Sequence, residues 1–222
     1  MKINLKNKTA WVFGGSKGIG RSIAIELAKS GANILLISRD RSALHNTKDE
    51  LCIKQNQEHD LLSIDISDTD NLIKTLKNYR NLNGVDIVIN NSGGPAAGPV
   101  HTAGVEEYLT AFRQHLIANQ VITQIALGVM KRKQFGRIIN IISTSVKQPI
   151  LGLGVSNTVR GAVANWAKTL ASEVGPFGVT VNNILPGATQ TDRLNNLIKN
   201  RAVKNNCSDQ EVAEQMKKSI PL

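Results

Sequence analysis

The sequence contains few of the residues on which several protein classes depend. It has 2 cysteines in 222 residues, and aromatic residues make up only 4%. Cys52 and Cys207 lie far apart and outside any CxxC or Cys/His cluster, so neither a disulfide framework nor a zinc site is predicted. We expect two free thiols and no bound metal.

Long apolar runs are also missing. Segments such as Asn33–Ser38 and Val85–Ile89 are far shorter than the roughly 20 residues that a membrane-spanning helix needs. The basic N-terminus, Met1–Lys8, lacks the apolar core and the small-residue cleavage site of a secretory signal. We therefore expect no membrane association and a location in the cytoplasm.

Acidic residues are outnumbered by basic ones. The chain has 27 Lys and Arg against 17 Asp and Glu, a formal net charge of +10, which attracts polyanions. The basic residues are scattered, however, and no aromatic-rich binding motif accompanies them, so no specific nucleic-acid partner is expected. We interpret the positive charge as solvated surface that also draws in a phosphorylated cofactor or an anionic substrate.

The order of the apolar segments predicts the fold class. Short β-branched runs alternate with longer amphipathic stretches, which is typical of βα units around a parallel sheet. We expect a single domain over residues 1–222 with a Rossmann-type doubly wound α/β fold, three layers and strand order 3-2-1-4-5-6. The predicted strands are Thr9–Phe13, Asn33–Ser38, Leu61–Asp65, Val85–Asn90, Arg137–Ile142 and Thr180–Leu185.

Helical periodicity is clearest in three stretches. A helix is predicted over Ile19–Ser30, and two more over Gln114–Arg132 and Ser156–Val174. The last two have continuous apolar faces, which suit a two-fold interface of four helices. We therefore expect a homodimer or a homotetramer.

A glycine-rich segment separates the first strand from the first helix. It reads Gly-Gly-Ser-Lys-Gly-Ile-Gly over residues 14–20. Glycines permit a tight turn and close approach to a pyrophosphate, whose charge is favoured at a helix N-terminus. The alternative is a glycine turn without a ligand. The predicted cofactor contacts here are Gly14, Ser16, Lys17, Gly18, Ile19 and Gly20.

The end of the second strand indicates which dinucleotide binds. About 20 residues past the glycines, where NAD enzymes place an acidic residue against the ribose, this chain has Ser38 and Arg39. Arg39 and Lys17 together favour a 2′-phosphate, so we predict NADP(H) in preference to NAD(H). The alternative is that Arg39 only pairs with Asp40 in solvent.

Several motifs in one order resemble the short-chain dehydrogenase/reductase family, particularly its 3-oxoacyl-[acyl-carrier-protein] reductase-like members. They are the glycines of residues 14–20, the Asn-Asn-Ser-Gly segment 90–93, the strand 136–143 that ends in Ser143, and the Pro-Gly segment 181–187. The resemblance extends over nearly the whole chain. The further cofactor contacts that it implies are Asp65, Ile66, Asn91, Ser92, Gly93, Pro186, Gly187, Thr189 and Thr191.

The catalytic positions of the resemblance are altered. Counting from Ser143, the family's Tyr-xxx-Lys pair falls at Ser156 and Arg160, and the asparagine of its tetrad falls near His115. A serine hydroxyl is a weaker acid than a phenol, so Ser156 is expected to donate a hydrogen bond rather than a proton. Arg160 is expected to bind the nicotinamide ribose, and His115 is the candidate proton donor. The alternative for His115 is a packed or surface histidine.

These residues lead to two functional hypotheses. The first is an NADP(H)-dependent oxidoreductase acting on a small-molecule carbonyl or alcohol, such as a 3-oxoacyl thioester or a related ketone. The second is a cofactor-binding pseudoenzyme that senses redox state or stabilises a partner protein, because the tyrosine and lysine are replaced. Residues 187–222 are expected to form a substrate-lid segment. If 222 residues is the natural length, the sheet keeps six strands and lacks a seventh.

Overall fold

The computed structural model describes residues 3–218 and residue 220. The chain divides into two compact units, Met1–Pro186 and Gly187–Leu222. Each unit is described by itself.

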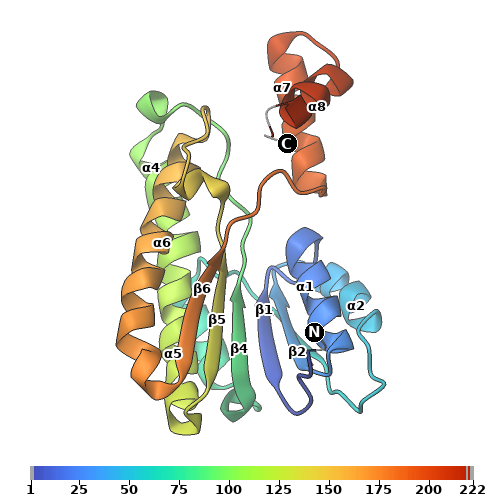
Figure 1. The fold of residues 1–222 in the computed structure, drawn as a ribbon, viewed down its shortest axis with the longest axis vertical. Helices are drawn as coiled ribbons and strands as arrows, with labels where there is room; N and C mark the ends of the chain where they lie inside the picture. Colours follow the sequence, from blue (N-terminus) through green and yellow to red (C-terminus); the bar gives the residue numbers. More distant parts are fainter. Residues whose placement is uncertain (1–2, 219, 221–222) are drawn as a thin grey trace. The chain divides into compact units, whose positions relative to one another are not determined.

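The first unit contains a six-stranded parallel sheet in the order β3-β2-β1-β4-β5-β6 (Figure 1). The strands are β1 (Thr9–Phe13), β2 (Asn33–Ser38), β3 (Asp60–Ser63), β4 (Val85–Asn90), β5 (Gly136–Ile141) and β6 (Val179–Ile184). The predicted fold class and strand order are confirmed. β1, β2 and β4 have their predicted bounds, and β5 and β6 begin and end one residue earlier than predicted. The largest difference is that β3 ends at Ser63, so Asp65 lies in the following loop.

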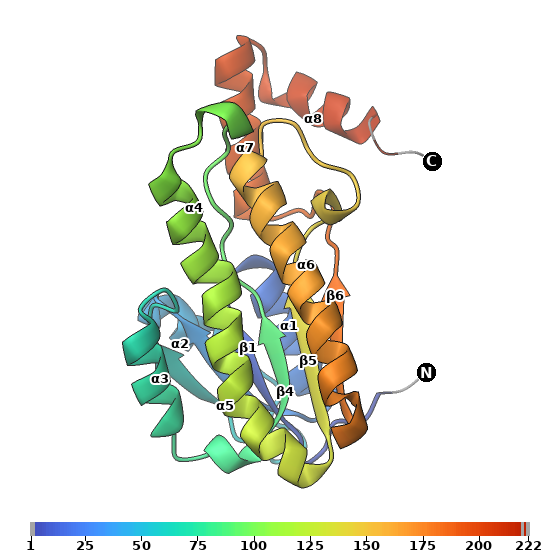
Figure 2. The ribbon, with the colours of Figure 1, turned by 90° about the vertical axis from the view of Figure 1, so that its left-hand side faces the viewer.

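Helices cover both faces of this sheet (Figures 1 and 2). The helices are α1 (Gly18–Lys29), α2 (Arg41–Asp49), α3 (Thr69–Lys77), α4 (Val105–Phe112), α5 (Ala118–Lys133) and α6 (Gly154–Val174). α1 and α2 lie on one face, and α3, α5 and α6 lie on the other. The predicted Ile19–Ser30 and Ser156–Val174 helices are thus α1 and α6, shifted by one or two residues.

The sheet is buried on both faces, as the nearly continuous apolar strands require. One core cluster joins Trp11, Val88 and Ile138 to α3, α5 and α6. A second joins Val12 and Ile89 to α1 and α2. Full burial of each such side chain contributes about 1.5 to 3 kcal/mol, so these two clusters hold the layers together.

The helix predicted over Gln114–Arg132 is longer and less regular than its periodicity indicates. α4 and α5 are joined by a π-helical turn, Arg113–Ile117. A π turn widens the helix by one residue and is common at functional sites. This turn contains His115.

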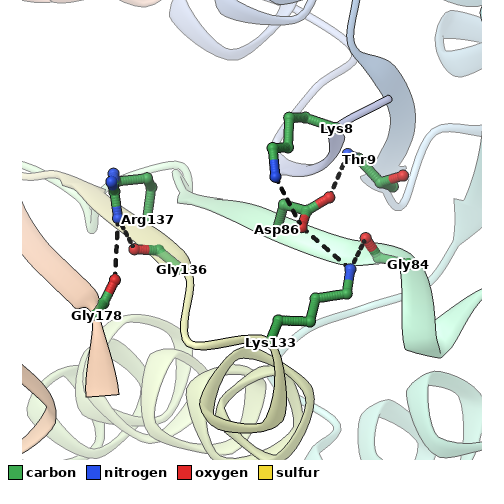
Figure 3. A network of polar contacts seen from close by, with 8 residues as sticks. All are labelled: Lys8, Thr9, Gly84, Asp86, Lys133, Gly136, Arg137 and Gly178. Atoms are coloured by element: carbon green, nitrogen blue, oxygen red, sulfur yellow. Dashed lines mark hydrogen bonds and ion pairs between the residues drawn. The ribbon is translucent and has the colours of Figure 1, made fainter. Parts of the chain in front are cut away.

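Buried charge at the amino end of the sheet is neutralised by neighbouring groups (Figure 3). The Asp86 side chain is only 5% exposed, and it accepts hydrogen bonds from the Thr9 N–H at 3.0 Å and from Lys133 Nζ at 3.1 Å. Lys8 Nζ lies 3.8 Å away, and Lys133 also donates to the Gly84 carbonyl at 2.9 Å. This network ties β1, β4 and the end of α5 together.

The second unit contains α7 (Asp192–Asn205) and α8 (Asp209–Lys218). Asn206 adopts a left-handed conformation with φ of 50° and ends α7. Before α8 the Ser208 N–H donates to the Glu211 carboxylate at 2.8 Å, and the Glu211 N–H donates to the Ser208 hydroxyl at 3.2 Å, which is a capping box. In neither unit is any described helix both long enough and apolar enough to cross a membrane.

Candidate nucleotide-binding and catalytic site

The glycine turn between β1 and α1 is packed too closely for side chains at Gly14, Gly15 and Gly20. Gly14 has φ of 62°, and a Cβ there would lie 2.5 Å from the amide nitrogen of Asn91. A Cβ at Gly20 would collide with the Gly14 carbonyl oxygen. The Asn91 amide donates to the carbonyl oxygens of Phe13 at 3.3 Å and Gly14 at 3.4 Å. These bonds connect the residue that follows β4 to the glycine turn.

This turn leaves the start of α1 open. Asp40 and Asp68 cap α2 and α3 by accepting the N–H groups of Ala43 and Asn71, but Lys17 makes no such bond at the start of α1. The first turn of α1 also contains no acidic residue. N–H groups of an uncapped helix start bind anions, so the residues present fit a dinucleotide diphosphate.

The two predicted 2′-phosphate ligands are each paired with a carboxylate. Lys17 Nζ lies 3.0 Å from Asp40, and Arg39 lies 3.7 Å from Asp65 rather than beside Asp40. The Ala43 N–H, followed by Lys17, holds the pKa of Asp40 below its usual value. Partial burial opposes ionisation of Asp65, but hydrogen bonds from Ser67 and the charge of Arg39 lower its pKa. Both cations remain largely exposed, at 66% and 74%, and so accessible to an anion.

Other predicted cofactor contacts surround this turn. The Ser16 carbonyl accepts a hydrogen bond from the Thr47 hydroxyl at 3.3 Å. The Ser38 hydroxyl is buried at the end of β2, and within the described residues it has no hydrogen-bond partner. Ile19 and Ile66 pack against the two core clusters, and Gly93 has open space around it. Their contact with a cofactor stays a prediction.

Ser143 lies where β5 leaves the sheet. It begins the short 3-10 helix Thr144–Val146, and its hydroxyl oxygen accepts the Ser145 N–H at 3.0 Å. The hydroxyl proton remains available for donation to another acceptor. The Thr144 N–H donates to the Pro186 carbonyl at 3.3 Å, which connects the serine loop to the residues after β6.

Ser156 and Arg160 lie one helical turn apart in the first half of α6, and they are 6% and 7% exposed. The Arg160 guanidinium donates to the carbonyl oxygen of Ile141, the last residue of β5, at 2.7 Å. α6 also packs against the 3-10 helix that follows Ser143. A buried cation is thus held at the carboxyl end of β5, beside the serine loop.

His115 is buried, with 3% exposure, in the π turn that packs against α6. Its Nδ1 lies 2.8 Å from the hydroxyl oxygen of Ser92. The structure therefore places Ser143, Ser156, Arg160 and His115 on neighbouring elements at one edge of the sheet. Their catalytic roles stay predictions.

The sequence reasoning missed a row of asparagine side chains at the same edge. The Asn90 amide donates to Asn140 at 2.8 Å, and the Asn140 amide donates to Asn183 at 3.0 Å. These residues are in register at the ends of β4, β5 and β6. The available signal was an asparagine near the end of each of three otherwise apolar strands. This row aligns the loops that carry Ser92, Ser143 and Pro186.

The remaining predicted contacts belong to the second unit. The Thr189 hydroxyl donates to the Gly187 carbonyl at 3.4 Å, and the Thr191 hydroxyl donates to the Thr189 carbonyl at 3.2 Å. Thr191 precedes α7 but makes no side-chain cap. The predicted nicotinamide contact of Thr191 thus remains a prediction.

A cavity elsewhere in the first unit contains none of these residues. It has a volume of about 520 Å³ and lies along β3 and α3, where Asp60, Lys74 and Tyr79 contribute to its wall. Burial, together with the nearby Asp60 carboxylate, raises the pKa of Tyr79 to about 12. No group of three or more potential metal-ligating side chains occurs among the residues described.

Comparison with known proteins assigns the family. The sequence pattern of the family described as "short chain dehydrogenase" matches residues 8–202. The chain belongs to this family of oxidoreductases. Its six-stranded Rossmann-type sheet is the fold of the solved members that it resembles.

Individual relatives cover nearly the whole chain. The NADPH-dependent reductase BacG of Bacillus subtilis is 29% identical over 220 residues, which are 98% of this chain and 85% of BacG. The 3-oxoacyl-[acyl-carrier-protein] reductase FabG of Aquifex aeolicus is 26% identical over 223 residues, which cover 100% of this chain and 86% of FabG. The crystal structure of YwfH, an NADPH-dependent reductase involved in bacilysin biosynthesis, is 28% identical with a TM-score of 0.87, covering 96% of this chain and 84% of YwfH.

Proposed function

We propose that the protein is an NADP(H)-dependent oxidoreductase that transfers hydride between the nicotinamide and a carbonyl or alcohol carbon. The observation that carries this proposal is the close-packed glycine turn of residues 14–20, which opens onto the uncapped start of α1. Lys17 and Arg39 favour the cofactor with a 2′-phosphate. The NADPH-dependent reductases among the relatives support the same choice.

The bound cofactor supplies the hydride, and the protein binds it and handles the proton. The proposed cofactor contacts are Gly14, Ser16, Lys17, Gly18, Ile19, Gly20, Ser38, Arg39, Asp65, Ile66, Asn91, Ser92, Gly93, Arg160, Pro186, Gly187, Thr189 and Thr191. Burial of Arg160 favours a role in which its charge offsets negative charge near the reacting oxygen.

Besides Arg160, three residues carry the proposed chemistry. Ser143 donates a hydrogen bond that polarises the substrate oxygen, since the bond that its oxygen accepts from the Ser145 N–H leaves the hydroxyl proton free to donate. Ser156 supplies a second hydrogen bond from α6. The proton comes from water or from His115, since one nitrogen of a neutral imidazole donates a proton while the other accepts.

The proposal also covers the class of substrate and the oligomeric state. A 3-oxoacyl thioester or a related ketone fits the likeness to the 3-oxoacyl-[acyl-carrier-protein] reductase. We further propose that residues 187–222 border the substrate within a single functional domain, that the chain forms a homodimer or homotetramer, and that it acts in the cytoplasm without a specific nucleic-acid partner.

One observation favours a second candidate, a cofactor-binding pseudoenzyme that senses redox state or stabilises a partner protein. The Arg160 guanidinium is bound to the Ile141 carbonyl, so part of its hydrogen-bonding capacity is used by the protein. Ser156 is also a poor proton donor. This protein would bind NADPH without turning over a carbonyl.

Cofactor choice is tested by titrating NADPH and NADH into the wild type and a Lys17→Ala/Arg39→Ala double variant. We expect the double variant to lose about tenfold in NADPH affinity and little in NADH affinity, because only NADPH has a 2′-phosphate. Lys168→Ala, an exposed lysine of α6, is the matched control. Equal losses for both nucleotides would contradict the proposed preference.

Turnover is tested by following NADPH oxidation with a panel of carbonyl compounds. Ser143→Ala is expected to lower kcat about 100-fold or more, as loss of an oxyanion donor does. Tight NADPH binding with no oxidation above the Ser143→Ala background favours the pseudoenzyme. Absence of nucleotide binding overturns both candidates.

A further inference from the structure

The buried histidine of the site is bound by a residue of the loop that follows β4. Ser92 Oγ lies 2.8 Å from His115 Nδ1, and the two residues are 23 positions apart in the chain. Ser92 lies two residues after the end of β4, whereas His115 lies in the π turn between α4 and α5. Only the fold brings them together.

The two partners differ in burial. His115 is 3% exposed, whereas Ser92 is half-buried and is followed by the exposed Gly93. The hydroxyl therefore lies between the exposed loop and the buried ring. A hydroxyl both donates and accepts hydrogen bonds, so this arrangement connects the imidazole to groups nearer to solvent.

Among the charged side chains on the helices packed against the π turn and on the turn itself, one is buried. The turn packs against α4, α5 and α6. Of the charged side chains that these helices and the turn carry, Arg160 is buried. The others are Glu106 and Glu107 at the start of α4, Arg113 in the turn, Lys131, Arg132 and Lys133 at the far end of α5, and Lys168 and Glu173 on α6.

We propose that Ser92 is a positioning residue that holds His115 in the tautomer with its proton on Nε2. When the Ser92 hydroxyl donates to Nδ1, that nitrogen is an acceptor and the ring proton must lie on Nε2. A neutral imidazole in this form passes a proton without becoming charged, because one nitrogen accepts while the other donates.

This role of His115 depends on the proposed reduction, in which each proton that the ring gives up is replaced. Nε2, which is itself buried, gives its proton through water to the substrate oxygen as hydride reaches the carbon. Nδ1 takes the hydroxyl proton of Ser92, and the Ser92 oxygen recovers a proton from solvent. The ring then holds its proton on Nδ1 and returns to the Nε2–H form by exchange with water.

The tautomer is tested by nitrogen NMR of ¹⁵N-labelled imidazoles in the full chain. His115→Gln assigns the resonances, and Ser172→Ala, a serine whose hydroxyl donates to the Lys168 carbonyl on α6, is the control. We expect the wild type to show Nδ1 unprotonated and Nε2 protonated, Ser92→Ala to mix the two tautomers, and Ser92→Thr to restore the wild-type pattern. A wild type protonated on Nδ1, or a Ser92→Ala spectrum identical to it, overturns the proposal.

Turnover separates this inference from the proposed function. We expect Ser92→Ala to lower kcat about tenfold, to leave the KM for the carbonyl compound nearly unchanged and to alter the pH profile. In the His115→Gln background it should add nothing further. If the wild type turns over but Ser92→Ala keeps its kcat and pH profile, the proposal is overturned while the proposed function stands. If the wild type reduces no carbonyl, the proposed function fails, and the NMR pattern alone decides the proposal.

Discussion

The two ends of the parallel sheet differ in how their polar side chains find hydrogen-bond partners. At the amino end, charged side chains are neutralised by the protein itself: Asp86 binds Lys133 and the Thr9 N–H, and Arg137 donates to the carbonyl oxygens of Gly136 at 2.7 Å and Gly178 at 3.1 Å (Figure 3). At the carboxyl end, neutral asparagine amides bind one another.

Helix termini show the same contrast. α5 ends near the amino edge with Lys131, Arg132 and Lys133 in its last turn, which complements its dipole. α1 and α6 begin at the carboxyl edge without side-chain caps and without acidic residues in their first turns. The amino end therefore stabilises the fold, whereas at the carboxyl end the start of α1 keeps its first N–H groups available for a ligand.

The comparison predicts that Asp86→Ala has the largest effect on stability and none on nucleotide binding. Removing the carboxylate leaves the Thr9 N–H without its acceptor and leaves Lys133 with the Gly84 carbonyl but no counter-charge, and we expect a loss of about 3 kcal/mol in the free energy of unfolding. Urea denaturation measures this loss. Lys8→Ala, which removes only the more distant partner, should cost no more than about 1 kcal/mol.

Removing one side chain of the asparagine row should destabilise the fold less than Asp86→Ala does, but it should also weaken nucleotide binding. Asn140→Ala removes the acceptor of Asn90 and the donor to Asn183, so we expect about 2 kcal/mol of destabilisation and weaker nucleotide binding. Asn182→Ala is the matched control, because Asn182 is exposed on β6, and it should stay within about 0.5 kcal/mol of the wild type. Equal effects of the two variants would contradict the proposed role of the row.

A histidine near the amino end makes stability depend on pH. His59 Nδ1 accepts the Ile34 N–H at 3.1 Å, and Nε2 lies 3.0 Å from the Cys52 carbonyl. Burial, with a smaller effect of Lys48, lowers the pKa of His59, so the folded state favours the neutral ring. Its contribution is complete above the unfolded pKa of about 6.5 and is lost as the pH falls below it.

Urea midpoints measured from pH 7.5 to pH 5 test this dependence. We expect the midpoint to fall with pH in the wild type and to fall less steeply in His59→Ala. His45→Ala, an exposed histidine of α2, should keep the wild-type slope. A His59→Ala slope equal to that of the wild type would show that other groups cause the pH dependence.

The smallest predicted effect concerns the carboxyl end. Asp40→Asn keeps an acceptor for the Ala43 N–H but removes the charge paired with Lys17. We expect NADPH to bind about two- to threefold more tightly and NADH to bind unchanged, since an exposed pair is weak. Calorimetric titration at low salt measures the ratio, and an equal gain for both nucleotides would contradict the pairing of Lys17 with a 2′-phosphate.

Local patterns predicted much of this molecule. The strand order and the helical layers followed from alternation of apolar segments, and the glycine turn followed from its place between β1 and α1. The π turn around His115 could not be predicted, because its apolar spacing also fits an ordinary helix. Arg39 pairs with Asp65 and not with Asp40, which was the alternative to its 2′-phosphate role, because β3 ends at Ser63 and leaves Asp65 in a loop beside the end of β2.

The sequence by itself determined the parallel α/β architecture and the position of the glycine turn, since both depend on residue types at short spacing. Tertiary structure alone decided that Ser92 meets His115, that Arg160 binds the Ile141 carbonyl and that three asparagines align. Each of these contacts joins residues far apart in the chain. Their meeting depends on strand register and helix packing, which no local pattern of residues specifies.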